Sequence, residues 1–293
     1  MKKHIFSYKS FIHIFFTIYS LLCVLPFLLV VAISFSTESD VINNGFKFIP
    51  EHFTLDAYKQ IFGAPETLIR AYGVTLFAAF CGTAFSVIIQ AMIGYALSRD
   101  VCSFKKPVNI ILLITMFFHG GLIPSYIINT QVLHLGDNIL MYVLSGAVSA
   151  YMIFVYRTFF KGISVSLIES AQLDGATEMQ MLFKIVIPLS KPIIATYSFT
   201  GILARWNDYA VPMYYMTEPR LYNLQYLLQQ ILNEASFLKQ MKDLMPALAG
   251  SVEIPNETLK FAMCVLAAGP MVLLFPFFQK YFAKGMVVGS VKG

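Results

Sequence analysis

The feature that most constrains the fold of this chain is a series of long apolar runs. A helix needs about 20 apolar residues to cross a bilayer, and six segments reach that length. They are Phe11–Phe35, Ala71–Leu97, Val108–Asn129, Asn138–Phe159, Ile193–Tyr215 and Leu259–Phe278. None alternates polar and apolar residues as barrel strands do. We therefore expect an all-α polytopic membrane protein with six transmembrane helices, forming one domain over residues 1–293.

The composition agrees with a membrane location. Hydrophobic residues make up 57% of the 293 residues and charged residues 13%. Charged residues make up about 25% of an ordinary soluble domain. The net charge of +5 does not indicate nucleic-acid binding, since the basic residues lie at the ends of apolar runs and form no stripe. No cysteine or histidine spacing suits a metal, so we expect no metal site and no disulfide.

The distribution of Lys and Arg predicts the orientation. Basic residues outnumber acidic ones at the N-terminus, in the loops after the second and fourth runs, and in the C-terminal tail. Acidic residues predominate in the other connections. By the positive-inside rule both termini face the cytoplasm. The first run is longer than the ~7–15 residues of a signal-peptide core and no cleavage site closes it, so we read it as an uncleaved span.

Two long external segments follow from this orientation, over residues 36–69 and 217–258. In the first we expect a short helix over Leu55–Phe62. In the second an apolar stripe has helical spacing, formed by Leu221, Leu224, Leu228 and Ile231. The stripe either packs on the chain's own helices or meets an external partner.

The third run contains two features that weaken a helix. Gly120 and Gly121 are adjacent, and Pro124 follows them. A break within a membrane survives only where it is buried in protein or lines a water-filled cavity. The alternative is that the glycines allow a tight helix crossing.

A polar hairpin is expected between the fourth and fifth runs, over residues 160–192. Ser166 and Glu169 fit a capping box that starts one helix, and Asp174-Gly175 ends it, since glycine permits a left-handed turn. Thr177 and Gln180 form a second candidate cap. Pro188 and Pro192 then stop the run before the fifth span.

Apolar residues within this hairpin predict how it packs. They recur at the i, i+3, i+4, i+7 spacing of one helical face, and they are Met179, Leu182, Phe183 and Val186. We expect this face to contact the protein's own bundle, while residues 167–176 protrude. Such a knob suits the docking of a soluble partner.

This segment resembles the cytoplasmic EAA loop of ABC importer permeases, which runs Glu-Ala-Ala, three residues, Gly and a late Pro. The matching residues are Glu169, Ala171, Asp174, Gly175, Ala176, Pro188 and Pro192, while Ser170 replaces the middle alanine. The resemblance implies that the loop contacts an ATPase through Glu169, Ser170, Ala171, Asp174, Gly175 and Ala176.

The resemblance extends over essentially the whole chain, to the carbohydrate-uptake branch of these permeases. It is carried by Phe48-Ile49-Pro50 with Thr54–Tyr58, by Gly94–Arg99 and by Trp206–Tyr209. Gly120–Pro124 and the tail Gln279–Gly293 resemble the subgroup that handles oligosaccharides from complex polysaccharides. This implies a bacterial cytoplasmic-membrane importer with a second homologous permease subunit, two ATPase subunits and an extracellular solute-binding protein.

The chain carries no nucleotide-binding motif of its own. There is no GxxxxGK[ST] phosphate loop, so we expect ATP and Mg²⁺ on a partner ATPase and neither cofactor nor catalytic residue here. In place of chemistry the resemblance implies mechanical coupling: ATP closes the ATPase dimer, the hairpin moves with it, and the bundle tilts between inward-open and outward-open states.

A polar cluster lies within the fifth run. Arg205 and Asp208 are three residues apart and can neutralise each other on one helical face, either as a structural ion pair or in the pore. Trp206, Asn207, Asp208 and Tyr209 are candidates for the substrate path. Aromatic rings suit the C–H faces of a saccharide, and the amide and carboxylate suit its hydroxyls.

Two alternative functions compete with this interpretation. An ion-coupled secondary transporter predicts internal repeats and more buried carboxylates than the sequence contains. A membrane-embedded lipid-modifying enzyme needs clustered acids or histidine ligands at the end of a span, and Asp174-Gly175 alone is too little.

Overall fold

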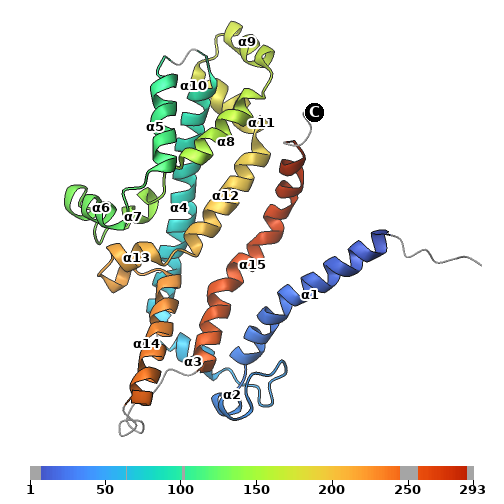
Figure 1. Ribbon diagram of the computed structural model, residues 1–293, viewed down its shortest axis with the longest axis vertical. Helices are drawn as coiled ribbons and strands as arrows, with labels where there is room; N and C mark the ends of the chain where they lie inside the picture. Colours follow the sequence, from blue (N-terminus) through green and yellow to red (C-terminus); the bar gives the residue numbers. More distant parts are fainter. Residues whose placement is uncertain (1–7, 64, 101–102, 245–256, 289–293) are drawn as a thin grey trace, which may run out of the picture. The chain divides into compact units, whose positions relative to one another are not determined.

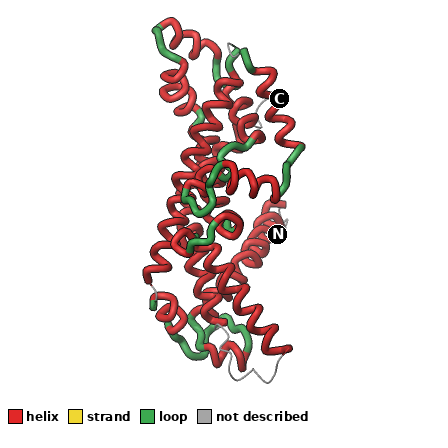
Figure 2. Tube along the Cα trace, turned by 90° about the vertical axis from the view of Figure 1, so that its left-hand side faces the viewer, coloured by secondary structure: helices red, strands yellow, loops and turns green. Residues whose placement is uncertain are grey.

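A computed structural model describes residues 8–63, 65–100, 103–244 and 257–288 of the chain. These residues form helices joined by loops and contain no β-strand (Figure 2). The all-α prediction is therefore confirmed. Parts of the sequence analysis lie outside the described residues: positions 245–256 of the predicted second external segment and the end of the tail from 289 to 293.

The chain divides into two compact units, which are described separately. One comprises residues 1–68 and 227–270, and the other residues 69–226 and 271–293. The prediction of a single membrane domain is not tested by this division.

The first unit contains the N-terminal helices and parts of three long ones. Its elements are α1 (Tyr8–Ser34), α2 (Glu38–Asn44), α3 (Asp56–Phe62), the start of α4 (Pro65–Ser98), most of α14 (Leu224–Leu244) and the first part of α15 (Glu257–Val288). The short helix predicted in the first external segment is α3. The Glu38 carboxylate caps α15, since it accepts hydrogen bonds from the backbone N–H of Glu257 at 2.8 Å and of Thr258 at 3.0 Å. This contact ties α2 to the start of α15.

The second unit is built around α4 (Figure 1). Its other elements are α5 (Lys105–Phe117), α6 (Leu122–Ile127), the π turn η1 (Ile128–Val132), α7 (Leu140–Leu144), α8 (Ala150–Lys161), α9 (Val165–Leu173), α10 (Glu178–Met181), the π turn η2 (Leu182–Val186), α11 (Ile187–Leu189), α12 (Lys191–Trp206), α13 (Ala210–Tyr215) and the 3₁₀ turn η3 (Pro219–Leu221). Glycine sets one close crossing here: a Cβ on Gly94 of α4 would lie 2.7 Å from the Cβ of Tyr156 on α8.

Three helices are long and apolar enough to cross a membrane without interruption: α1, α4 and residues Glu257–Gln279 of α15. Three bent helix pairs pass the same test of length and composition, which allows up to six spans if each pair crosses once. A membrane-spanning helical fold is thus confirmed, and the count of six remains a prediction.

Of the two interpretations of the glycine pair in the run Val108–Asn129, the structure shows the break. The chain turns by 119° between α5 and the pair of α6 with η1. The turn lies at the glycine pair, and Gly121 adopts the left-handed φ of +89°. A Cβ on Gly121 would meet no atom within 4 Å, so within the described residues this glycine serves the turn and not a tight helix crossing.

Two further predicted spans of this unit are also interrupted, whereas Ala71–Leu97 lies within the continuous α4. Residues 145–149 separate α7 from α8 within the predicted span Asn138–Phe159, and Gly146 has a φ of +64°. Residues 207–209 separate α12 from α13 within the predicted span Ile193–Tyr215. Apolar length alone does not reveal such breaks, because polar backbone inside a membrane can be satisfied by neighbouring protein.

The stripe predicted in the second external segment does form one face. Leu224 is fully buried, Leu228 is buried, and Leu221 and Ile231 are partly buried. The helix α14 begins three residues later than the stripe, at Leu224, where Asn223 accepts a hydrogen bond from the Tyr226 N–H at 2.9 Å. The packing interpretation is therefore supported for this face.

Candidate functional site

The predicted hairpin forms at one end of the second unit, from α9 to α11 (Figure 1). Its first helix ends at Leu173, and Gly175 takes the left-handed conformation at φ +77°. The Ala176 N–H reaches back to the carbonyl of Ala171 at 2.9 Å, which is the six-to-one bond of a Schellman turn. The predicted end of this helix at Asp174-Gly175 is confirmed.

The two predicted caps of the hairpin have different outcomes. Thr177 and Gln180 form a reciprocal capping box, with the Gln180 N–H on the Thr177 hydroxyl at 3.3 Å and the Thr177 N–H on Gln180 Oε1 at 2.9 Å. The predicted box at Ser166 is wrong. That hydroxyl pairs with the hydroxyl of Ser164 at 2.7 Å, and the helix already begins at Val165.

The packing face of the hairpin is shifted from the prediction. Leu182 and Val186 are buried as expected, together with Met181, but Met179 and Phe183 are exposed. Phe183 lies within the π turn η2, whose extra residue shifts the helical register. Met179 precedes this turn, and its exposure has no such explanation. The buried face packs on residues from α4, α8 and α9, among them Ala91, Tyr95, Tyr156, Phe160 and Ile168.

The helical run stops before α12, as predicted, but it ends one residue beyond Pro188. Pro188 lies inside the short helix α11, which ends only at Leu189. Pro192 lies in the first turn of α12, where its missing N–H costs no hydrogen bond. The chain bends by 84° between the two, so the hairpin is separated from α12 by a corner.

The six predicted docking residues lie together at the tip of the hairpin. Glu169, Ser170, Asp174 and Gly175 are exposed, and Ala171 and Ala176 are partly buried against the hairpin's core. The Glu169 carboxylate forms no hydrogen bond or ion pair with the part of the chain that the structure describes. The tip thus presents two carboxylates without a partner in the described residues, those of Glu169 and Asp174, beside small side chains.

Glu178 joins the hairpin to α4, and sequence reasoning missed this role. The Tyr95 hydroxyl donates to Glu178 Oε2 at 2.6 Å, and Arg99 Nε lies 3.5 Å from the same oxygen. Gln172 of α9 donates to Glu178 Oε1 at 3.5 Å. One carboxylate therefore connects both helices of the hairpin to the end of α4.

The predicted path residues lie at the break between α12 and α13. Trp206 is 1% exposed and packs near Tyr72, so its ring faces the core, whereas Tyr209 is 46% exposed. Asn207 is exposed and its side chain accepts from Gln225 Nε2 at 3.2 Å. Asp208 Oδ1 caps α13 by accepting from the N–H groups of Ala210 and Val211 at 2.8 and 3.1 Å.

The predicted Arg205–Asp208 ion pair does not form. The break after Trp206 turns Asp208 toward the start of α13, while Arg205 donates to Ser86 Oγ at 2.7 Å and to the Ser145 carbonyl at 3.3 Å. Gly82 makes this arrangement possible, because a Cβ there would collide with the Arg205 side chain.

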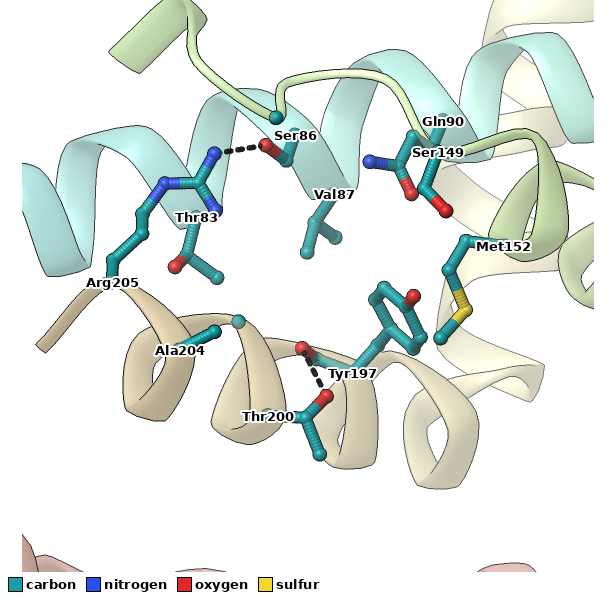
Figure 3. Close-up of a pocket in the computed structure, with 12 residues that line it drawn as sticks. Thr83, Ser86, Val87, Gln90, Ser149, Met152, Tyr197, Thr200, Ala204 and Arg205 are labelled. Atoms are coloured by element: carbon teal, nitrogen blue, oxygen red, sulfur yellow. Dashed lines mark hydrogen bonds between the residues drawn. The ribbon is translucent and has the colours of Figure 1, made fainter. Parts of the chain in front are cut away.

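Arg205 lies at one end of a cavity of about 290 Å³ (Figure 3). The walls come from α4, the 145–149 segment, α8 and α12. The residues that line it are Thr83, Ser86, Val87, Gln90, Gly146, Ser149, Met152, Tyr197, Thr200, Gly201, Ala204 and Arg205. Of the sequence candidates, none of the four path residues lines this cavity, and only their neighbour Arg205 does.

Comparisons with known proteins cover both the hairpin and the cavity. The family described as binding-protein-dependent transport system inner membrane component matches residues 85–288, which include the hairpin and most of the cavity wall. The polygalacturonan/rhamnogalacturonan transport system permease protein YtcP of Bacillus subtilis is 36% identical over 293 residues, the whole of both chains. Protein LplC of the same organism is 33% identical, over 92% of this chain and 90% of its own.

A solved structure matches the fold. It is a bacterial ABC transporter involved in the import of the acidic polysaccharide alginate. One of its chains aligns with a TM-score of 0.81 and 26% identity, over 96% of this chain and 99% of the other.

Proposed function

Because the chain belongs to the family of binding-protein-dependent transport system inner membrane components, we propose that it is the permease subunit through which an ATP-driven importer moves oligosaccharides across the bacterial cytoplasmic membrane. As a member of this family it is a multi-pass membrane transport subunit, and its relatives are permeases and not enzymes. The observation that carries the proposal is the hairpin within the matched region, with its exposed and unpaired Glu169.

The hairpin is the proposed contact with the ATPase subunit that drives transport. Glu169, Ser170, Ala171, Asp174, Gly175 and Ala176 dock an ATPase subunit that binds ATP and Mg²⁺. Small side chains at Ser170, Ala171 and Gly175 allow the partner's backbone to approach closely, and Glu169 supplies a charge for it. Movement of the hairpin is passed to α4 through Glu178 and Tyr95, which share the 2.6 Å hydrogen bond.

The complete importer has further subunits. A second homologous permease pairs with this chain, two ATPase subunits bind on the cytoplasmic side, and an extracellular solute-binding protein delivers the saccharide. In this arrangement both termini and the hairpin face the cytoplasm, in agreement with the distribution of basic residues.

Oligosaccharides are the proposed substrate class. The names of similar permeases include polygalacturonan/rhamnogalacturonan, arabinooligosaccharides and galactooligosaccharides. Oligogalacturonides are the first to test, because the relative named for polygalacturonan matches over the whole chain at 36% identity. Asn207, Asp208 and Tyr209 at the α12–α13 break are proposed to line the path, with Trp206 supporting them from the core.

Uptake into proteoliposomes tests the function. The importer, assembled with both permeases, the ATPase and the binding protein, is supplied with trigalacturonate and with neutral oligosaccharides. We expect accumulation only when the vesicles contain ATP. Uptake that an ion gradient drives without ATP would instead identify a secondary transporter, and the proposal would be wrong.

A further inference from the structure

The cavity beside α12 holds a charged side chain, Arg205, which Asp208 influences electrostatically but which forms no ion pair within the described residues. Arg205 donates to two neutral groups, the Ser86 hydroxyl and the Ser145 carbonyl. The nearest acid along the chain, Asp208, uses its carboxylate to cap α13. A guanidinium inside a membrane is costly unless it is paired or hydrated. Arg205 therefore retains an unused capacity to bind an anion.

Further polar groups of the cavity wall lack partners. Thr83 Oγ1, Gln90 Oε1 and Arg205 Nε are buried and have no hydrogen-bond partner within the described residues. Thr83 is 3% exposed and Gln90 2%. Buried polar groups are almost always hydrogen-bonded, so a cavity bordered by three unpartnered atoms is suited to a polar occupant.

The hydrogen bonding of Gln90 indicates which polar groups a ligand in this cavity must supply. Its Nε2 donates to the Ala147 carbonyl at 2.8 Å, which leaves Oε1 as an acceptor that requires a donor. Figure 3 shows Gln90 on α4 and Arg205 on α12 at the two ends of one space, with Tyr197 on the wall across from Gln90. A ligand that fills this space combines a negative charge at one end with hydroxyl donors and an apolar face at the other.

The size of the cavity limits the ligand. A volume of about 290 Å³ is at the lower end of the ~300–1,000 Å³ range of ligand pockets. It accommodates one sugar ring and not a longer chain. Gly201 of the wall lets α12 approach α4 closely, since a Cβ there would lie 2.9 Å from Thr83 Cγ2 on α4.

We propose that this cavity binds one acidic sugar unit, with the carboxylate of a uronate on Arg205 and its hydroxyls on Gln90 and Thr83. Guanidinium and carboxylate form strong paired hydrogen bonds, and the Tyr197 ring suits the C–H face of the sugar. Phosphate shares the charge, but it offers Gln90 Oε1 few hydroxyl donors. The inference rests on the proposed importer function and gives that importer a preference for acidic saccharides.

The site can be tested by measuring whether a ligand slows the chemical modification of a cysteine placed in the cavity wall. Ala204 lines the cavity and is exposed, so Ala204→Cys is introduced after Cys23, Cys81, Cys102 and Cys264 have been replaced by serine. The assembled importer is treated with a small methanethiosulfonate reagent. We expect trigalacturonate to slow the reaction, and carboxyl-reduced trigalacturonate, which has the same linkages but no charge, to leave it unchanged.

Substitution of Arg205 tests directly whether its charge is needed for protection of the cysteine. Loss of a charge-assisted hydrogen bond costs about 1.5–3 kcal/mol, so Arg205→Gln should raise the protecting concentration of trigalacturonate by about 10–100-fold. Arg157→Gln is the matched control. Arg157 also donates to a neutral amide, that of Asn109, at 3.1 Å, but it does not line the cavity. Its replacement should leave protection intact.

Three outcomes would overturn the site: equal protection by the two trisaccharides, unchanged protection in Arg205→Gln, or equal protection by inorganic phosphate. The comparison of the two trisaccharides uses the intact arginine, so it decides the question even if Arg205→Gln fails to assemble. ATP-driven uptake in the same vesicles separates this inference from the proposed function. Uptake of a saccharide without arginine-dependent protection rejects the site alone, and absence of any ATP-driven uptake rejects the importer.

Discussion

Glu178 is a single residue on which both helices of the hairpin and the end of α4 converge. Its carboxylate accepts from Tyr95 at 2.6 Å and from Gln172 at 3.5 Å, and Arg99 lies 3.5 Å away. The sequence could not reveal this convergence, because Tyr95 and Glu178 are 83 positions apart. Local patterns report capping and turns but not partners distant in the chain.

We predict that Tyr95→Phe and Glu178→Gln uncouple ATP hydrolysis from transport. Each removes one side of a charge-assisted hydrogen bond between the hairpin and α4, so the motor's movement reaches the bundle less completely. The number of ATP molecules hydrolysed per sugar transported should rise several-fold. Measuring both rates in the same proteoliposomes checks this ratio, which a general loss of folded protein would not change.

Asp100→Asn is the control for this pair. It breaks a neighbouring ion pair, Lys105–Asp100 at 2.7 Å, that does not reach the hairpin. The ATP-to-sugar ratio should then equal that of the wild type. If Asp100→Asn and Tyr95→Phe raised the ratio alike, Glu178 would have no special part in coupling.

Gly175 determines the turn of the hairpin through its backbone conformation alone. Its φ is +77°, and a Cβ there would meet no atom within 4 Å. Gly175→Ala should therefore destabilise the turn by about 1–2 kcal/mol through left-handed strain and weaken co-purification of the ATPase, while Gly175→Asn is milder. Gly73→Ala is the matched control, since Gly73 also has open space but lies within α4. Equal ATPase retention in Gly175→Ala and Gly73→Ala would contradict the account.

At the level of helices, the packing of α4 against α8 depends on Gly94. A Cβ there would lie 2.7 Å from Tyr156 Cβ and 3.2 Å from backbone atoms of Ile153 and Arg157, which cannot move aside. Overpacking of this kind costs about 1–3 kcal/mol. We predict that Gly94→Ala lowers the midpoint of thermal unfolding in detergent. An unchanged midpoint would show that the two helices are not held this closely.

The helices also show which elements a sequence can predict. Thr177 and Gln180 are three residues apart, so their capping box was predictable from local spacing. The buried face of the hairpin was only partly predictable, because the π turn over Leu182–Val186 shifts the helical register. The breaks at 145–149 and 207–209 escaped prediction. In the first, backbone carbonyls are satisfied by side chains far along the chain: Ser145 accepts from Arg205, and Ala147 from Gln90.

For the whole molecule, apolar length and charge predicted a helical membrane protein, and the hairpin motif predicted its family. Both are confirmed, the second by a match over residues 85–288 and by a structural similarity with a TM-score of 0.81. The number of membrane spans was harder to predict from the sequence. Three helices are uninterrupted and three pairs are bent, and hydropathy averages over such bends.

The central claim is that the hairpin faces the cytoplasm and is gripped by an ATPase. The direct measurement places a cysteine at the exposed Ser170 in the assembled importer, with the exposed Ser39 of α2 as the opposite-side control. We predict that Ser170→Cys reacts with a membrane-impermeant thiol reagent only from the cytoplasmic side and crosslinks to the ATPase, whereas Ser39→Cys reacts from outside and does not. Labelling of Ser170→Cys from outside, or crosslinks that never reach the ATPase, would contradict the account.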